Sequence, residues 1–99
     1  MKISISESAI EDLLAGYRFY ETQQESIGQY FLDSLFSDID SLALYAGVHP
    51  TFGGYRRMIA KRFPFAIYYK IERKIVRVRR VLDCRSNPTW IRKDLRSGR

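Results

Sequence analysis

Basic side chains recur from residue 55 to residue 83, and their type and spacing make them the first candidates for chemistry. Guanidinium and ammonium groups bind phosphate and carboxylate oxygens, the guanidinium in a planar two-point geometry. The richest cluster comprises Arg56, Arg57, Lys61, Arg62, Arg77, Arg79 and Arg80. We expect these side chains to form a surface for an acidic partner, either nucleic acid or an acidic protein segment. The alternative is an ordinary solvated sheet face on which arginine stems cover apolar neighbours.

The distribution of charge supports a basic surface. The net charge is +6, yet residues 1–50 hold two Lys/Arg against eight Asp/Glu, whereas residues 51–99 hold fifteen against three. The two halves could neutralise one another across the fold. The basic excess of the second half is larger than the acidic excess of the first, however, so the asymmetry favours an acidic partner.

Other chemistry has weak support in the sequence. His49 is the only histidine and precedes Pro50 in a predicted loop, where we expect a solvent-exposed side chain without a catalytic role. Cys84 is the only cysteine, so a disulfide framework and a cysteine-rich zinc site are excluded; we expect a small buried apolar residue. We expect no metal site and no cofactor.

Length and composition predict one folded domain over residues 1–99. The chain is 45% hydrophobic and 14% aromatic, which suits a single modest core. Its start has no apolar secretory core, and no stretch approaches membrane-spanning length. We therefore expect a cytoplasmic protein without a membrane partner.

Three strands are predicted over residues 55–61, 65–71 and 74–82, and they would position the basic cluster. A tight turn at 72–73 or 73–74 joins the last two. Alternation on the third strand places Arg77 and Arg79 on one face, opposite two valines, so one sheet face is packed and the other charged.

Single residues around this meander also have expected places. Alternation turns Arg80 inward, where it could pair with Asp83 or a helix carboxylate. Tyr68 and Tyr69 point to opposite faces, and one of them lies in the core. Asp83 and Arg85 flank the end of the last strand, as a binding pair or a structural ion pair. Trp90 is expected to pack on the core rather than anchor a partner.

The first half of the chain predicts a short strand at residues 2–5 and two helices. Ser6 or Ser8 caps the first helix, and residues 8–11 and 26–29 fit capping boxes. Helical spacing gives two apolar stripes: Ile10, Leu13, Leu14, Tyr17 and Tyr20, then Ile27, Phe31, Leu35, Ile39 and Leu42. The acidic residues fall largely outside these stripes: Glu11, Asp12, Glu21, Asp33, Asp38 and Asp40.

The remaining segments complete an α+β, two-layer fold. Residues 46–54 are a glycine- and proline-rich loop; Pro88 starts a short helix over 89–95, and residues 96–99 fray. Neither a helix pair nor a small sheet buries its apolar side alone. We expect an N-terminal strand and a helical hairpin packed on a small, mainly antiparallel sheet.

Two segments carry a resemblance to a known family. The first runs from Arg57 through Lys61-Arg62-Phe63-Pro64-Phe65-Ala66-Ile67-Tyr68-Tyr69, and the second is Val81-Leu82-Asp83-Cys84-Arg85-Ser86-Asn87-Pro88. With the element order and the Ala9–Leu13 helix opening, they resemble the RelE/ParE toxins of bacterial type II toxin–antitoxin pairs over nearly the whole chain.

The resemblance implies one of two activities. RelE-like members cut messenger RNA on the ribosome, and ParE-like members inhibit DNA gyrase. The ribonucleases carry a phosphate-binding arginine early in the penultimate strand, where this chain has Ala66; after Arg85 the nearest aromatic is Trp90, which is neither acid nor base. The paired tyrosines and the Phe-Pro turn resemble the ParE branch.

The resemblance therefore implies a ParE-like toxin that inhibits gyrase by binding and is neutralised by a cognate antitoxin, with which it could form a hetero-oligomer. The expected target-binding residues are Arg56, Arg57, Lys61, Arg62, Arg77, Arg79, Asp83, Arg85 and Trp90. One alternative is a ribosome-dependent, metal-independent ribonuclease that handles mRNA phosphates with Arg57, Lys61, Arg79 and Arg85. The other is a non-toxic relative that acts as a binding module.

Overall fold

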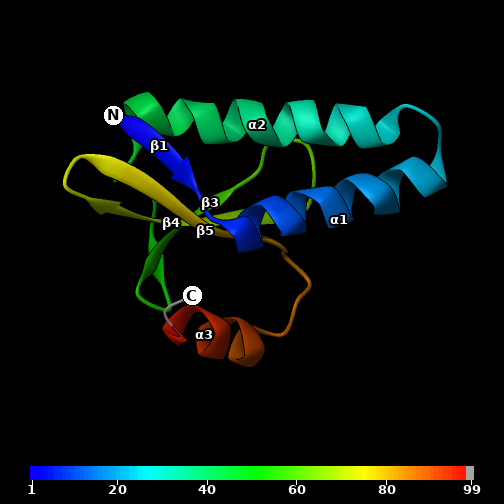
Figure 1. Cartoon of the computed structure of the whole chain (residues 1–99). Coiled ribbons are helices and arrows are strands. Elements are labelled where there is room, and N and C mark those ends of the chain that lie inside the picture. Colours follow the sequence, from blue (N-terminus) through cyan, green and yellow to red (C-terminus); the bar gives the residue numbers. More distant parts are fainter. Residues whose placement is uncertain (98–99) are drawn as a thin grey trace.

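The computed structural model describes residues 1–97, which form three helices and one five-stranded sheet (Figure 1). The elements are β1 (Lys2–Ile5), α1 (Glu7–Gln23), α2 (Ile27–Tyr45), β2 (Thr51–Phe52), β3 (Tyr55–Ile59), β4 (Phe65–Glu72), β5 (Ile75–Asp83) and α3 (Pro88–Arg96). The strand order is β1-β5-β4-β3-β2, with β1 parallel to β5 and the other pairs antiparallel. The predicted α+β class is confirmed. The last two residues of the segment expected to fray, 98–99, lie outside the described residues.

The helical hairpin covers one face of the sheet, as expected, and builds the main core there (Figure 1). On α2 the predicted stripe is confirmed from Phe31 to Leu42. On α1, Leu13 is buried and Tyr20 packs on the core as predicted, but Ile10 and Leu14 are exposed, and Ala9 and Gly16 are buried in their place. The buried stripe is thus rotated from the predicted one, because Gly16 leaves room for the ring of Phe31 to approach the helix backbone.

The caps differ from the predicted capping boxes. Ser6, not Ser8, is the N-cap of α1, and its hydroxyl accepts a hydrogen bond from the Ala9 amide at 3.0 Å. Ser26 begins α2 with φ +75° and makes no side-chain cap. The Glu21 carboxylate caps α2 instead, accepting from the Ser26 and Gly28 amides at 3.0 and 2.9 Å. Glu21 is therefore structural rather than solvent-facing.

The strands match their predicted ranges closely, and the loop before them contains one strand more. Arg73 and Lys74 form the β4–β5 turn with φ +52° and +65°, the signature of a type I′ hairpin. In the predicted loop 46–54, Thr51 and Phe52 pair with Arg56 and Tyr55 as β2. Sequence analysis missed β2 because two residues are too few for any periodic pattern.

The second face of the sheet is not uniformly charged, because α3 covers part of it (Figure 1). Ile91 and Leu95 of α3 form a smaller core with Ala66, Tyr68 and Leu82 from the strands. Tyr69 belongs to the main core, so both tyrosines are buried on opposite faces. The expected charged face therefore remains open only beyond α3.

Candidate partner-binding site

A bulge in β5 decides where its arginines point. Tyr69 pairs with Val78, whereas Tyr68 pairs with Arg80, so Arg79 is an extra residue in β5. Arg80 therefore lies opposite Tyr68 on the α3 face, and the prediction from strict alternation that it turns toward the helical hairpin is wrong. Both arginines reach α3 on the same side of the sheet.

Arg80 forms a partly buried ion-pair network with two helix carboxylates. Its Nε and Nη2 donate to Asp12 of α1 at 2.7 and 2.8 Å, and its Nη1 donates to Asp94 of α3 at 2.6 Å. These hydrogen bonds, foremost those that Arg80 donates to Asp12, raise the pKa of Arg80 despite its burial. The expected helix carboxylate is confirmed; Asp83 is not the partner, and Asp12 is not solvent-facing. The network joins α1 to α3 across the sheet edge.

Arg79 is also used inside the protein. The residue is 7% exposed, and its Nη2 donates to the Asp94 backbone carbonyl at 3.0 Å and to the Ser97 hydroxyl at 3.3 Å. With α3 in place it offers almost no surface to a macromolecular partner. The role as a target-binding or phosphate-handling residue thus stays a prediction that would require α3 to move.

The two arginines of β3 lie on opposite faces. Arg56 pairs with Tyr69, and its Nη1 donates to the His49 carbonyl at 2.8 Å. Arg57 pairs with Tyr68, and its guanidinium lies 5.4 Å from the Phe52 ring centroid, with Arg92 of α3 at 4.7 Å from the same ring. The structure therefore separates the predicted basic cluster instead of gathering it.

One group of predicted site residues is exposed at one end of the sheet. Phe65 pairs with Asp83, and the Cys84 amide donates to the Pro64 carbonyl at 2.8 Å, so the β3–β4 turn lies beside the segment that follows β5. The exposed basic residues here are Lys61, Arg62 and Arg85, and we call them the sheet-end patch.

Asp83 and Arg85 form an ion pair at the edge of the sheet-end patch. Arg85 donates to Asp83 through Nε at 2.9 Å and through Nη2 at 2.6 Å. The Arg85 guanidinium lowers the pKa of the Asp83 carboxyl, which is therefore ionised at neutral pH. The pair is exposed enough that Arg85 can turn toward a partner.

Three single residues differ from their expected surroundings. Trp90 is 47% exposed, with the Arg80 guanidinium 5.6 Å from its ring centroid, so the expected core packing is wrong. His49 is partly buried rather than free in solvent, and its Nδ1 lies 2.5 Å from the Tyr69 hydroxyl. Cys84 is half-buried against the smaller core.

Sequence analysis missed several polar residues that the structure uses. Asp38 on α2 is buried and accepts from the Lys61 amide at 3.1 Å, which holds the start of the β3–β4 turn. Asp12 and Asp94 hold Arg80, although nothing in their spacing marks them. The only available signal was the adjacent Arg79-Arg80 pair, which cannot alternate regularly in a half-buried strand.

Two further structural observations concern metal ions and membranes. Among residues 1–97, no three His, Cys, Asp or Glu side chains lie close enough together to hold a metal ion. Within the same range, no helix has the length and apolar character needed to cross a membrane.

Comparison with known proteins places the fold and the family. The structure is similar to a solved chain described as the chromosomal ParDE toxin–antitoxin system from P. aeruginosa, with a TM-score of 0.73 and 19% sequence identity over 82% of this chain and 92% of that one. No curated protein gives a significant sequence match. The model of the ParE toxin family, described as the toxin of the parDE type II toxin–antitoxin system, matches residues 3–88. Because that match spans most of the chain, this protein belongs to the ParE toxin family of type II toxin–antitoxin systems.

Proposed function

We propose that this ParE-family chain inhibits DNA gyrase by binding it, acts in the cytoplasm, and is neutralised by a cognate antitoxin. The family match supports the toxin class, and the similar ParDE structure supports an antitoxin partner. The surface we assign to the target is the sheet-end patch, Lys61, Arg62 and Arg85, and the exposed Trp90 of α3 is a further candidate contact. Tryptophan and arginine are over-represented among residues that dominate binding energy.

Ala66 is the main observation that favours binding over RNA cleavage. Ala66 is 0% exposed and packs under α3, at the place where the resemblance implies a phosphate-binding arginine in the ribonucleases. Nearby groups do not replace it: Tyr68 is 1% exposed, and burial raises the pKa of its hydroxyl, so it cannot act as a base. Asp83 is ionised and paired with Arg85. A surface with such groups suits binding rather than proton transfer.

The proposal is tested by a supercoiling assay with purified gyrase, relaxed plasmid and increasing amounts of the protein. We expect inhibition by the natural chain and at least a tenfold higher inhibitory concentration for the triple variant Lys61→Gln, Arg62→Gln, Arg85→Gln. The matched control, Lys2→Gln, Arg18→Gln, Lys74→Gln, removes the same charge from exposed positions elsewhere and should inhibit like the natural chain.

Two outcomes would contradict the proposal. Unchanged supercoiling at saturating protein, combined with transcripts cut within codons in expressing cells, would indicate a ribonuclease. Unchanged supercoiling combined with normal growth under strong expression without antitoxin would indicate a non-toxic binding module. Equal loss of inhibition in both triple variants would preserve the gyrase target but refute the sheet-end patch as its contact surface.

A further inference from the structure

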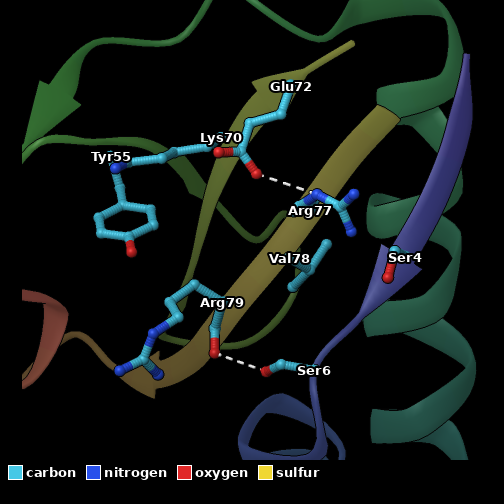
Figure 2. Close-up of a pocket in the computed structure, with 8 residues that line it drawn as sticks. All are labelled: Ser4, Ser6, Tyr55, Lys70, Glu72, Arg77, Val78 and Arg79. Carbon is cyan, nitrogen blue, oxygen red and sulfur yellow. Dashed lines mark hydrogen bonds and ion pairs between the residues drawn. The ribbon is translucent and has the colours of Figure 1, made fainter. Parts of the chain in front are cut away.

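A cleft of about 300 Å³ opens on the α3 side of the sheet, beyond the part that α3 covers (Figure 2). Its polar lining comes from β1, β3, β4 and β5. The register sets Ser4, Arg77 and Lys70 in one row across three neighbouring strands, since Arg77 pairs with Ser4 on β1 and with Lys70 on β4. Ser6, Tyr55, Glu72 and Arg79 complete the polar lining.

Positive charge dominates this cleft. Lys70, Arg77 and Arg79 line it together with one carboxylate, Glu72; the Asp94 carboxylate, outside the lining, lies 3.7 Å from Arg79 Nη2 and offsets part of the Arg79 charge. Glu72 accepts from the Arg77 Nε at 2.9 Å, with both side chains about half exposed, so this pair is weak and can rearrange. The Lys70 ammonium lies 4.4 Å from the Tyr55 ring centroid, which holds it over the cleft.

Arg79 adds a buried and incompletely paired positive charge beside this cleft. Its Nη2 is satisfied by α3, but Nε and Nη1 are buried and have no hydrogen-bond acceptor among residues 1–97. A buried donor without an acceptor is energetically costly, and more so when the group is charged. Because those two nitrogens are buried, a ligand in the cleft would not touch them, and Arg79 contributes positive potential from beneath the cleft that it lines.

We propose that this cleft binds a small phosphorylated ligand, with Arg77 and Lys70 contacting its phosphate oxygens. The excess positive charge of the lining complements a phosphate, and the Ser4 and Tyr55 hydroxyls offer neutral donors. The volume is at the lower end for small-molecule sites. Glu72, half exposed at the end of β4, would repel the continuing backbone of a nucleic acid. This inference is independent of the proposed gyrase target.

The test is calorimetric titration of the full chain with inorganic pyrophosphate at constant ionic strength. We expect one-to-one binding, weakened at least tenfold in the double variant Lys70→Gln, Arg77→Gln. Both residues are exposed, so the variant should fold, and circular dichroism checks this. The matched control, Arg18→Gln with Lys93→Gln, removes the same charges outside the cleft and should bind within about twofold of the natural chain.

Several results would overturn the inference. One is the absence of binding heat with the natural chain. Another is a loss of affinity in the control variant equal to that in the cleft variant, which would indicate diffuse electrostatic attraction. A single-stranded oligonucleotide provides the third arm. If it binds far more tightly than pyrophosphate and loses affinity in the cleft variant, the site recognises a nucleic-acid backbone and the small-ligand proposal is wrong.

Discussion

Replacing Asp12 by alanine should destabilise the protein strongly although the residue lies on a surface helix. The Asp12 carboxylate accepts from Arg80 Nε, from Arg80 Nη2 and from the Val81 amide at 2.7, 2.8 and 3.0 Å. The Asp12 and Arg80 side chains are only 13% and 15% exposed. Alanine would leave a mostly buried guanidinium with one carboxylate, Asp94, and a backbone donor on β5 without an acceptor.

The expected cost is about 2–4 kcal/mol. Removing one partner of a buried ion pair costs about 3–5 kcal/mol, and the remaining Asp94 contact reduces that figure. A domain of this size has about 5–15 kcal/mol of stability in total, and the loss should lower its melting temperature by roughly 10–20 °C. Urea unfolding monitored by circular dichroism measures the difference directly.

The control is Glu72→Ala, which breaks the exposed pair with Arg77 and should cost about 1 kcal/mol or less. Asp12→Asn keeps an acceptor for the Val81 amide and should fall between the two. A double-mutant cycle with Arg80→Met separates the ion pair from the amide contact. If Asp12→Ala cost no more than Glu72→Ala, the reasoning that this network joins α1 to β5 would be refuted.

Two further predictions follow from buried contacts. Burial, and secondarily the nearby Arg56 charge, lowers the pKa of His49 below its usual 6.5, so the folded state prefers the neutral ring, whose Nδ1 is hydrogen-bonded to the Tyr69 hydroxyl. Because the unfolded chain then binds the proton more readily, the free energy of unfolding should fall as pH drops below about 6.5. Urea midpoints measured across this pH range should fall less in His49→Gln than in the natural chain. An identical fall in both would contradict the assignment. Gly16→Ala should cost about 1–3 kcal/mol of stability by overpacking, because a Cβ at Gly16 would lie 2.4 Å from the Phe31 ring. Ala15→Gly, at an exposed neighbouring position, measures the separate effect of helix propensity. Unchanged stability in Gly16→Ala would show that α1 and α2 can separate freely.

Sequence patterns predicted the elements well where side chains repeat regularly. The α2 stripe recurs at helical spacing and is buried as predicted from Phe31 to Leu42. The β4–β5 turn was placed because two apolar runs flank a short polar pair. On α1 the pattern gave the helix but not its buried side, since Gly16 has no side chain to enter a hydrophobic pattern, yet it is where Phe31 packs.

At the candidate site, sequence patterns identified the basic residues but did not predict where each side chain points. The basic residues could be named from the sequence, and Lys61, Arg62 and Arg85 are exposed as a partner-binding surface requires. Arg79 and Arg80 were placed by strict alternation, and one extra residue in β5 reversed that result for Arg80. A bulge depends on the pairing of two strands, so no property of β5 alone predicts it.

The sequence by itself determined the element order, the α+β class and the basic character of the second half, because local propensity and side-chain periodicity act over a few neighbouring residues. Only the tertiary structure decided which cations remain available. Asp12 and Asp94 are 82 residues apart in the chain and meet on Arg80 only after α1 and α3 have packed on the sheet. The same packing buries Arg79 and leaves Lys70 and Arg77 open beside it, because burial and ion pairing depend on contacts between segments far apart in the chain.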